Sequence, residues 1–405
     1  MKYDFETLLD RHGHDAIAVD AVGDPRWEGF APTAPKEGFD CIPMWVADMN
    51  FPVPRSIQEA MIRRIEHPAF GYFSPSDEYY ASIISWHGRR KGVTDLTRHE
   101  IGYENGVLGG LISALNAFIS PGDKVLLHSP TYMGFTNSIE NAGFRIVHSP
   151  LVRDEAGVWR MDYEDMERKI RKEQIRAAVF CSPHNPCGRV WTRDEVAEAM
   201  AVYERNGVMV ISDEIWSDLL LDGRSYTPSQ SVSDWAKTHV IALYAPSKTF
   251  NLAGLIGSYH VIYDKAVRDR VENVSSKCHY NSMNVLSQYA LIGAYSREGE
   301  DWLEQLLPVL SENARLGAAC VKERLDGVTA FHPEGTYMMF LDCGAWLKAR
   351  GITQPELLKM GWDYGIGWQD GALFKAPECI RLNLASPTHR IREAFERMDK
   401  YVFGR

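Results

Sequence analysis

The chain has 405 residues, of which 45% are hydrophobic and 24% are charged, a balance typical of a folded globular protein rather than a disordered or fibrous one. At roughly 100–200 residues per domain, this length predicts two or three domains. Asp and Glu (54) outnumber Lys and Arg (44), and the formal net charge of −10 provides no chain-wide basic field for binding nucleic acid.

The amino terminus and the cysteines indicate the cellular compartment. The first residues, MKYDFETLLDRHGHD, lack the apolar core of a secretory signal, and no stretch approaches the ~20 apolar residues of a membrane helix. The seven cysteines are odd in number and never form a C-x-x-C pair, which argues against a disulfide framework and against a zinc site. We therefore expect a reduced, cytoplasmic protein with no metal and no membrane partner.

In chain order, residues 1–50 are rich in Gly and Pro and predict little regular structure, whereas helical periodicity predicts helices over Ser56–Glu66 and Asp77–Arg90. From about residue 105 to 262, short runs rich in Val, Ile and Ala alternate with amphipathic stretches of helical length. Because these runs are apolar on both faces, we expect central strands of a mostly parallel sheet covered by helices. The runs are Lys124–His128, Ala177–Cys181, Val208–Ser212 and Val240–Tyr244.

After residue 282 the pattern predicts a second, smaller α+β part. Its expected elements are helices Met283–Tyr295 and Glu300–Leu325, strands Tyr337–Asp342 and Cys379–Leu384, and a closing helix Ile391–Phe403. The expected fold class is therefore α/β, with a large domain over residues 49–284 and a small domain over residues 285–405. We expect the amino-terminal segment, residues 1–48, to pack with the small domain.

Each of the four apolar runs leads into a polar cluster on its carboxyl side. The clusters are SPTY (129–132), SPHNPCG (182–188), DEIW (213–216) and APSKT (245–249). One such cluster is simply a polar turn, but ligands of open α/β sheets bind beyond the carboxyl ends of parallel strands. Four clusters at one edge therefore predict a single pocket.

Two of these residues carry the chemistry. Lys248 directly follows a buried strand, where desolvation lowers the pKa of an amine and makes it a candidate Schiff-base lysine, although a lysine on a surface turn is the commoner case. Asp213 ends an apolar run and is costly to bury without a positive partner. The protonated pyridine nitrogen of pyridoxal phosphate would be such a partner, because sites for this cofactor pair a Schiff-base lysine with an aspartate. A helix N-cap is the alternative role for Asp213.

Further residues fit the same cofactor. Tyr132 offers a ring-stacking face, and Asn185 a hydrogen bond to a phenolate oxygen. The glycine-rich stretch 105–110 opens a predicted helix, Leu111–Ile119, whose start would attract phosphate, although a tight turn would look the same. Arg381 is a candidate clamp for a substrate carboxylate, with a structural ion pair as its alternative.

The set GVLGG, SPTY, SPHNPCGR, SDEIW, APSKTFNLAGL and RLNLA, in this order along nearly the whole chain, resembles the fold type I pyridoxal-phosphate enzymes of the class I/II aminotransferase superfamily. Within that superfamily, CIPMWVADMNFPVP, AFGYFSP and PEGTYMMFLD look like the MalY/PatB group of cystathionine or cysteine-S-conjugate β-lyases (C-S lyases). The resemblance implies a fold with a central, mostly parallel sheet flanked by helices and a smaller α+β domain.

The resemblance also implies a role for each site residue. Lys248 would hold the cofactor as an internal aldimine and act as acid and base, and Asp213 would pair with the pyridine nitrogen. The other implied cofactor contacts are Asn185 at the ring oxygen, Tyr132 on the ring, Gly106, Val107, Leu108 and Ser247 at the phosphate, Trp216 beside the ring, and Tyr72 of a neighbouring subunit in a homodimer. The implied substrate contacts are Arg381 at the α-carboxylate with Trp45, Val46, Ala47 and Asn185.

Two positions depart from the superfamily pattern. Trp216 stands where these aminotransferases often have a tyrosine, and Ile256 stands where they often have a phosphate-binding arginine. The resemblance therefore favours α,β-elimination from a small sulfur-containing L-amino acid, giving a thiol, pyruvate and ammonia. A class I/II aminotransferase is the first alternative, and a non-catalytic regulatory or binding protein on the same fold is the second.

Overall fold

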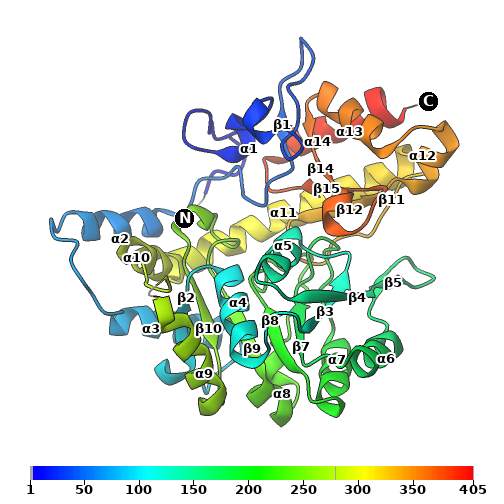
Figure 1. The fold of residues 1–405 in the computed structure, drawn as a ribbon. Coiled ribbons are helices and arrows are strands. Elements are labelled where there is room, and N and C mark those ends of the chain that lie inside the picture. The colour runs from blue at the N-terminus through cyan, green and yellow to red at the C-terminus, as the bar shows by residue number, and fades with distance from the viewer. Residues whose placement is uncertain (1–2, 279, 405) are drawn as a thin grey trace.

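The computed structural model describes residues 3–278 and 280–404, and its larger part is built on a seven-stranded sheet (Figure 1). Five neighbouring strands run parallel, and β10 runs antiparallel to both strands beside it, so the predicted mostly parallel sheet is confirmed. In spatial order the strands are β2 (Ile101–Glu104), β10 (Ser258–Val261), β9 (Val240–Tyr244), β8 (Met209–Asp213), β7 (Ala177–Cys181), β3 (Lys124–Ser129) and β4 (Arg145–Pro150).

The middle strands follow from their sequences. Every residue of β7 (AAVFC) and of β9 (VIALY) is buried, as expected for strands that are covered on both faces. β8 begins one residue later than predicted and includes Asp213. The strands β2 and β10 have mixed sequences without a long apolar run, because they hold Glu104 and His260, a buried pair whose oxygen and nitrogen lie 2.8 Å apart.

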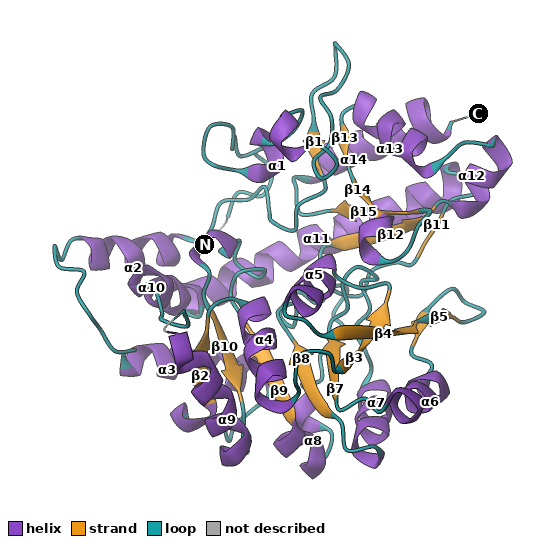
Figure 2. Cartoon of the chain, viewed as in Figure 1, coloured by secondary structure: helices purple, strands orange, loops and turns teal. Residues whose placement is uncertain are grey.

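Helices cover both faces of this sheet, and Figure 2 shows them around it. One face carries α4 (Val107–Phe118), α5 (Met133–Asn141) and α9 (Lys265–Ser275), and the other carries α6 (Tyr163–Glu173), α7 (Arg193–Arg205) and α8 (Asp234–His239). Near the β2 end, α2 (Arg55–Ile65), α3 (Asp77–Lys91) and α10 (Val285–Ala294) pack together. No helix within residues 3–278 and 280–404 has the length and apolar character needed to cross a membrane.

The helix α11 (Arg297–Arg324) connects the two parts of the molecule (Figure 1). At 1.5 Å per residue its 28 residues span about 42 Å. It begins three residues before the predicted start, because the side chain of Ser296 accepts a hydrogen bond from the backbone N–H of Gly299 and caps the helix there.

The smaller part contains a four-stranded antiparallel sheet with three helices beside it. The strands are β11 (Thr329–Ala330), β12 (Met338–Asp342), β15 (Cys379–Asn383) and β14 (Gln369–Asp370), and the helices are α12 (Gly344–Arg350), α13 (Gln354–Asp363) and α14 (Thr388–Arg397). The predicted closing helix Ile391–Phe403 is wrong in its last turn, since the α-helix ends at Arg397 and a π-helical turn, Met398–Phe403, follows it.

The amino-terminal segment lies beside this smaller part. It contains a short helix, α1 (Ile17–Asp20), and its strand β1 (Ile42–Pro43) pairs in parallel with β13 (Ile366–Gly367). Elsewhere in the chain, β5 (Val152–Arg153) and β6 (Trp159–Arg160) form a separate two-stranded antiparallel hairpin. The pairing of β1 with β13 places part of the amino-terminal segment against the smaller part of the molecule. The domain boundaries 1–48, 49–284 and 285–405 stay a prediction.

Candidate active site

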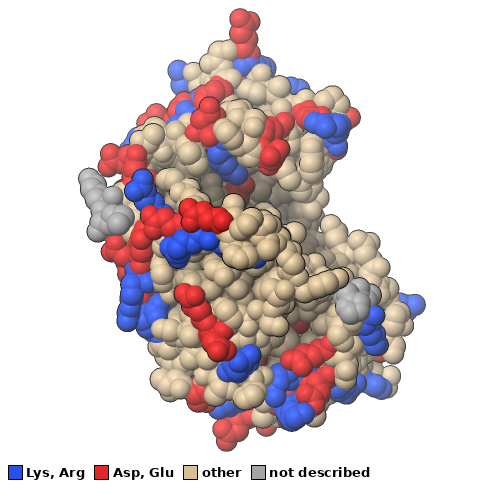
Figure 3. All heavy atoms as spheres, turned by 90° about the vertical axis from the view of Figure 1, so that its left-hand side faces the viewer, with Lys and Arg blue, Asp and Glu red and all other residues tan. Residues whose placement is uncertain are grey.

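A cavity of about 340 Å³ lies at the carboxyl ends of β7, β8 and β9, beside the start of α4. Figure 3 shows the surface hollowed between the two parts of the molecule. The residues predicted for the site that line the cavity are Ala47, Gly106, Val107, Leu108, Tyr132, Asn185, Asp213, Trp216, Ser247 and Lys248. Segments hundreds of residues apart in the sequence therefore meet at one place, as the four polar clusters predicted.

Lys248 stands in the turn after β9, with its amine facing the cavity. Its Nζ donates a hydrogen bond to the carbonyl oxygen of Ala47 at 2.9 Å and lies 5.8 Å from the ring centre of Trp216. Burial and the nearby guanidinium of Arg381 lower the pKa of Lys248 to about 8. A lysine with this pKa has a substantial neutral fraction near pH 7–8, which a carbonyl-binding nucleophile needs.

Asp213 ends β8 and is 5% exposed. Its Oδ1 accepts a hydrogen bond from the backbone N–H of Ile215 at 3.0 Å, and a turn rather than a helix follows, so the alternative role as a helix N-cap is wrong. Burial raises the pKa of Asp213 to about 7, which the Ile215 hydrogen bond and the charge of Lys248 only partly oppose. A cationic ligand atom at this carboxylate would remove the cost of its burial.

Arg381 reaches the site from β15 of the smaller part and is 3% exposed. Its guanidinium donates to three neutral oxygens, namely the carbonyl of Trp45 at 2.7 Å, Oε1 of Gln369 at 2.5 Å and Oδ1 of Asn185 at 3.3 Å. Its Nε is buried without a hydrogen-bond partner in the described chain. Burial lowers the pKa of Arg381 to about 10.

No carboxylate of the described chain forms an ion pair with Arg381, so the alternative of a structural ion pair is wrong within residues 3–278 and 280–404. The guanidinium carbon of Arg381 lies 4.4 Å from the ring centre of Phe374, a cation–π contact. A buried guanidinium with only neutral partners is well suited to bind an anion, and a carboxylate matches its geometry best. Gln369 and Phe374 were missed in the sequence, because they carry no local signal of a role at this site.

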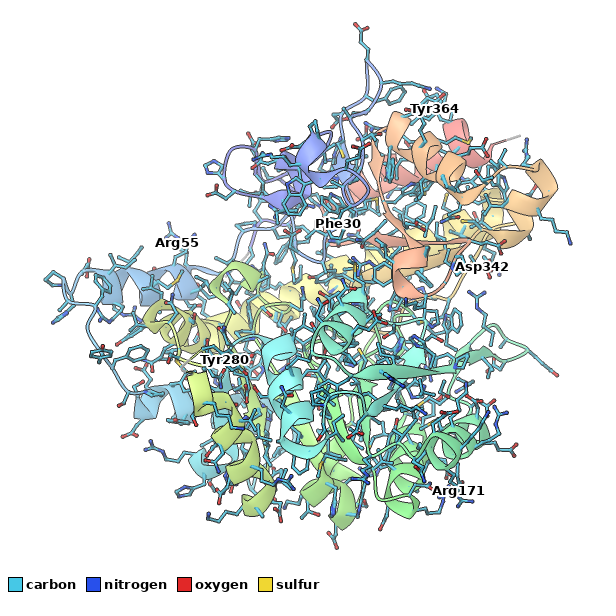
Figure 4. All side chains as sticks on the ribbon, in the orientation of Figure 1. Phe30, Arg55, Arg171, Tyr280, Asp342 and Tyr364 are labelled. Carbon is cyan, nitrogen blue, oxygen red and sulfur yellow. The ribbon has the colours of Figure 1, made fainter. Side chains whose placement is uncertain are left out.

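The phosphate seat predicted at stretch 105–110 lies at the start of α4. Gly106 is the residue before the helix and has a φ of +79°, which an L-residue adopts only with strain. Val107 and Leu108, the first residues of the helix, line the cavity, and the free backbone N–H groups of a helix start favour a phosphate there. Tyr280 packs against this helix through a hydrogen bond with Ser113 (Figure 4).

The segment before α2 contributes main-chain groups rather than side chains. The carbonyl oxygen of Ala47 accepts from Lys248 and from the hydroxyl of Tyr337, at 3.0 Å, while the carbonyl of Trp45 accepts from Arg381. The ring of Trp45 points toward the amino-terminal segment, where its Nε1 donates to the carbonyl of Ala18 at 3.0 Å and Phe30 packs on it (Figure 4). Val46 contributes a carbonyl that accepts from Asn383 at 2.6 Å.

The remaining predicted residues occupy different places. Tyr132, the residue before α5, lines the cavity, and burial raises the pKa of its hydroxyl. Trp216 lies edge-on to Tyr337, with ring centres 4.8 Å apart. Tyr72 lies in the loop between α2 and α3, is fully exposed and does not reach the cavity of its own chain. Its predicted role therefore requires a second chain.

This fold and this site define a class of protein, the fold type I pyridoxal-phosphate enzymes, in which a lysine and an aspartate meet at the strand ends of a mostly parallel sheet. Residues 40–398 match the family model described as aminotransferase class I and II, and the chain belongs to this family. The fold class and the family predicted from the sequence are confirmed.

The proteins most relevant to the comparison belong to a narrower group within this family. The chain is 34% identical over 357 residues to cystathionine beta-lyase PatB of Bacillus subtilis (strain 168), a match that covers 88% of this chain and 89% of that protein. Its fold is similar to that of cystalysin from Treponema denticola, which contains pyridoxal 5′-phosphate (TM-score 0.89, 27% identity, 99% of each chain). It is also similar to the pyridoxal-phosphate-bound C-S lyase of Staphylococcus hominis (TM-score 0.87, 27% identity, 100% of this chain and 99% of that one).

The residues present fit the cofactor that these proteins hold. The cavity brings together an amine for its aldehyde, a buried carboxylate that forms no ion pair with any described residue, and a helix start for its phosphate. The predicted cofactor thus agrees with the family and with the chemistry of the site. The roles of individual residues remain predictions.

Proposed function

We propose that this protein is a pyridoxal-phosphate-dependent carbon–sulfur β-lyase that acts on a small sulfur-containing L-amino acid. In this reaction the bond between Cβ and sulfur breaks, a thiol leaves, and hydrolysis of the remaining skeleton gives pyruvate and ammonia. The observation that carries the proposal is the buried Arg381, which has no carboxylate partner among the described residues and donates a hydrogen bond to Asn185, a residue of the cavity that Lys248 and Asp213 also line. The names of the relatives support a C-S lyase rather than another reaction of the family.

The chain's own residues perform binding and proton transfer. When bound, the cofactor supplies an electron sink that makes the substrate's Cα–H bond acidic. Lys248 would bind the cofactor and then remove this proton, a role that suits an amine whose pKa is lowered to about 8. Asp213 would keep a proton on the pyridine nitrogen, and that charge would in turn offset the burial of Asp213.

Other groups would fix the positions of cofactor and substrate. The amides of Val107 and Leu108, with the hydroxyl of Ser247 and Tyr72 from a partner chain, would bind the phosphate, while Gly106 leaves room for it. The cofactor ring would lie on Tyr132 with Asn185 at its oxygen and Trp216 beside it. Arg381 would bind the α-carboxylate bidentately, with Trp45, Val46 and Ala47 forming that side of the site. Anchors on the cofactor phosphate and on the substrate carboxylate would together orient Cα toward the lysine.

We also propose a cytoplasmic homodimer. Exposed apolar side chains gather on α2 and the loop after it. They are Ile62 (53% exposed), Ile65 (51%), Phe70 (57%), Tyr72 (112%) and Phe73 (37%). A cluster of this kind marks an interaction surface in a folded protein. The six cysteines whose side chains the structure describes are free, which suits a reducing compartment.

The test is incubation of the purified protein with pyridoxal phosphate and cystathionine or cysteine S-conjugates. We expect pyruvate, ammonia and thiol in equal amounts without any oxo-acid acceptor, and loss of this activity in Lys248→Ala. Amino transfer that requires an oxo acid would replace the proposal with the aminotransferase alternative. If borohydride reduction leaves no pyridoxyl adduct on Lys248, the non-catalytic alternative gains support and the lyase proposal fails.

A further inference from the structure

The segment Trp45–Asn50 is bound to the site mainly through its backbone. The carbonyl oxygen of Ala47 accepts from Nζ of Lys248 at 2.9 Å and from the hydroxyl of Tyr337 at 3.0 Å. On either side of it, Asn383 donates to the carbonyls of Val46 and Asp48, each at 2.6 Å. The direction of the Lys248 amine therefore depends on how firmly this segment is held.

Asp48, the next residue, carries a carboxylate that Arg11 neutralises. Nη1 of Arg11 donates to Oδ1 of Asp48 at 3.1 Å, and its Nη2 forms an ion pair with Oδ2. Nη1 also donates to Oδ1 of the buried Asn50 at 3.0 Å. The side chains of Arg11 and Asp48 are only 13% and 18% exposed, so water screens the pair incompletely. A two-point pair of this kind fixes the segment more firmly than a single contact would.

Charged and titratable groups surround Lys248 from several elements. Burial and the guanidinium of Arg381 lower the pKa of Lys248, and the carboxylates of Asp48 and Asp213 raise it, Asp48 more strongly than Asp213. Asp48 and Arg11 also act on Tyr337, whose pKa is raised first by burial. The groups that face or line this region are Asp213 at the end of β8, Cys181 of β7, Asp48 and Arg11 of the amino-terminal segment, Arg381 of β15, Tyr132 before α5 and Tyr337 before β12.

We propose that Asp48, held and partly neutralised by Arg11, is a positioning residue for Lys248 that orients its amine through the Ala47 carbonyl and supplies a negative charge near it whose strength Arg11 limits. The inference rests on the proposed function, in which Lys248 both takes up and releases a proton. Arg11 lies 37 residues from Asp48 and belongs to no motif of the sequence, yet it tunes the negative charge beside the lysine.

The test compares Asp48→Asn and Arg11→Met in the holoenzyme, with the pH dependence of the cofactor's absorbance as the readout. Removing the carboxylate should lower the midpoint of this titration, and removing the guanidinium should raise it. Each shift should be on the order of one pH unit, the size expected for one incompletely screened charge at an effective dielectric constant near 20. Arg11→Lys, which keeps the charge, should restore most of the wild-type midpoint, and the double variant should fall between the two single variants.

The matched control is Asp24→Asn, which removes the carboxylate of another Arg–Asp pair of the same segment, Arg26–Asp24, and should leave the midpoint unchanged. Shifts of both single variants in the same direction, or no shift in either, would overturn the proposal. A second readout needs no cofactor: the pH dependence of acylation of Lys248, followed by mass spectrometry on the full chain, should move in the same two directions. If the wild type binds no cofactor, the proposed function fails, and the acylation measurement still decides this proposal.

Discussion

At the scale of single residues, the site contains two buried ionisable groups that lack a close counter-charge in the described chain. Asp213 accepts a backbone hydrogen bond, and Arg381 has only neutral acceptors. Burial of such groups costs free energy of folding unless a ligand supplies the missing charge. The cofactor and the substrate together would supply both missing charges, because a protonated ring nitrogen suits the aspartate and an α-carboxylate suits the arginine. These two buried groups therefore lower the stability of the folded chain without ligands and favour the binding of cofactor and substrate.

Asp213→Asn should stabilise the cofactor-free chain at pH 8 while weakening cofactor binding and activity. The carboxyl has a pKa of about 7 when folded and an ordinary value of 3.8, so the unfolded chain releases this proton first as pH rises. The folded state therefore loses stability between about pH 4 and pH 7, by up to about 4 kcal/mol at 1.36 kcal/mol per pKa unit. Thermal unfolding of both proteins at pH 8 measures the difference.

The same comparison at pH 4.5 is the control for this substitution. There the wild-type carboxyl is protonated in the folded chain but mostly ionised in the unfolded one, so the stabilisation by Asn should fall to about a quarter of its value at pH 8. A variant that is less stable than the wild type at pH 8 would show that Asp213 already has a compensating partner in the folded chain.

At the scale of elements, the sequence predicted the middle of the sheet and the pocket at its edge, and it missed what depends on distant neighbours. Strands β7 and β9 are apolar runs that end in polar turns, so local pattern was sufficient for them. The strands β2 and β10 were not predicted, because Glu104 and His260 are buried only by pairing with each other across 156 residues of sequence. Gln369, which accepts a hydrogen bond from Arg381 across the pairing of β14 with β15, was missed because a single glutamine carries no local signal of such a contact.

The start of α4 offers a test of the phosphate seat. Ile256 lines the cavity near it, at 3.7 Å from where a side chain on Gly106 would begin, and stands where related aminotransferases often have an arginine. Its φ of +48° is unfavourable for a β-branched residue. Ile256→Arg should relieve part of this strain and add a charge-assisted bond to phosphate, tightening cofactor binding about tenfold. Equilibrium dialysis of the cofactor measures the change.

Ile256→Gln is the matched control, since it has a similar length and the same relief of branching but no charge. It should bind the cofactor within about twofold of the wild type, because surface substitutions without a new charge have small effects. Equal tightening by Gln and Arg would mean that the phosphate does not lie at this end of the cavity.

At the scale of the whole molecule, one chain brings ten of the predicted site residues to the cavity wall and Arg381 into contact with Asn185, whereas Tyr72 projects from the loop after α2 together with exposed apolar side chains. If this face joins two copies of the chain, symmetry makes each contact occur twice, and both cavities gain a tyrosine from the partner. The active unit would then be the dimer, and loss of the apolar contacts would reduce cofactor affinity without any change inside the cavity.

Mixed dimers test this arrangement directly. Lys248→Ala removes the amine, and Tyr72→Ala weakens the phosphate site, so each variant alone should show little activity at limiting cofactor. Equal mixing with subunit exchange makes about half of all dimers mixed, and each of these has one cavity with an intact Lys248 and a Tyr72 from the partner. Activity should therefore return to about a quarter of the wild-type value. Recovery should follow the time course of exchange and stop when the chains are cross-linked beforehand. If Tyr72 instead serves its own chain, every cavity in the mixture lacks one of the two residues, and no activity will return.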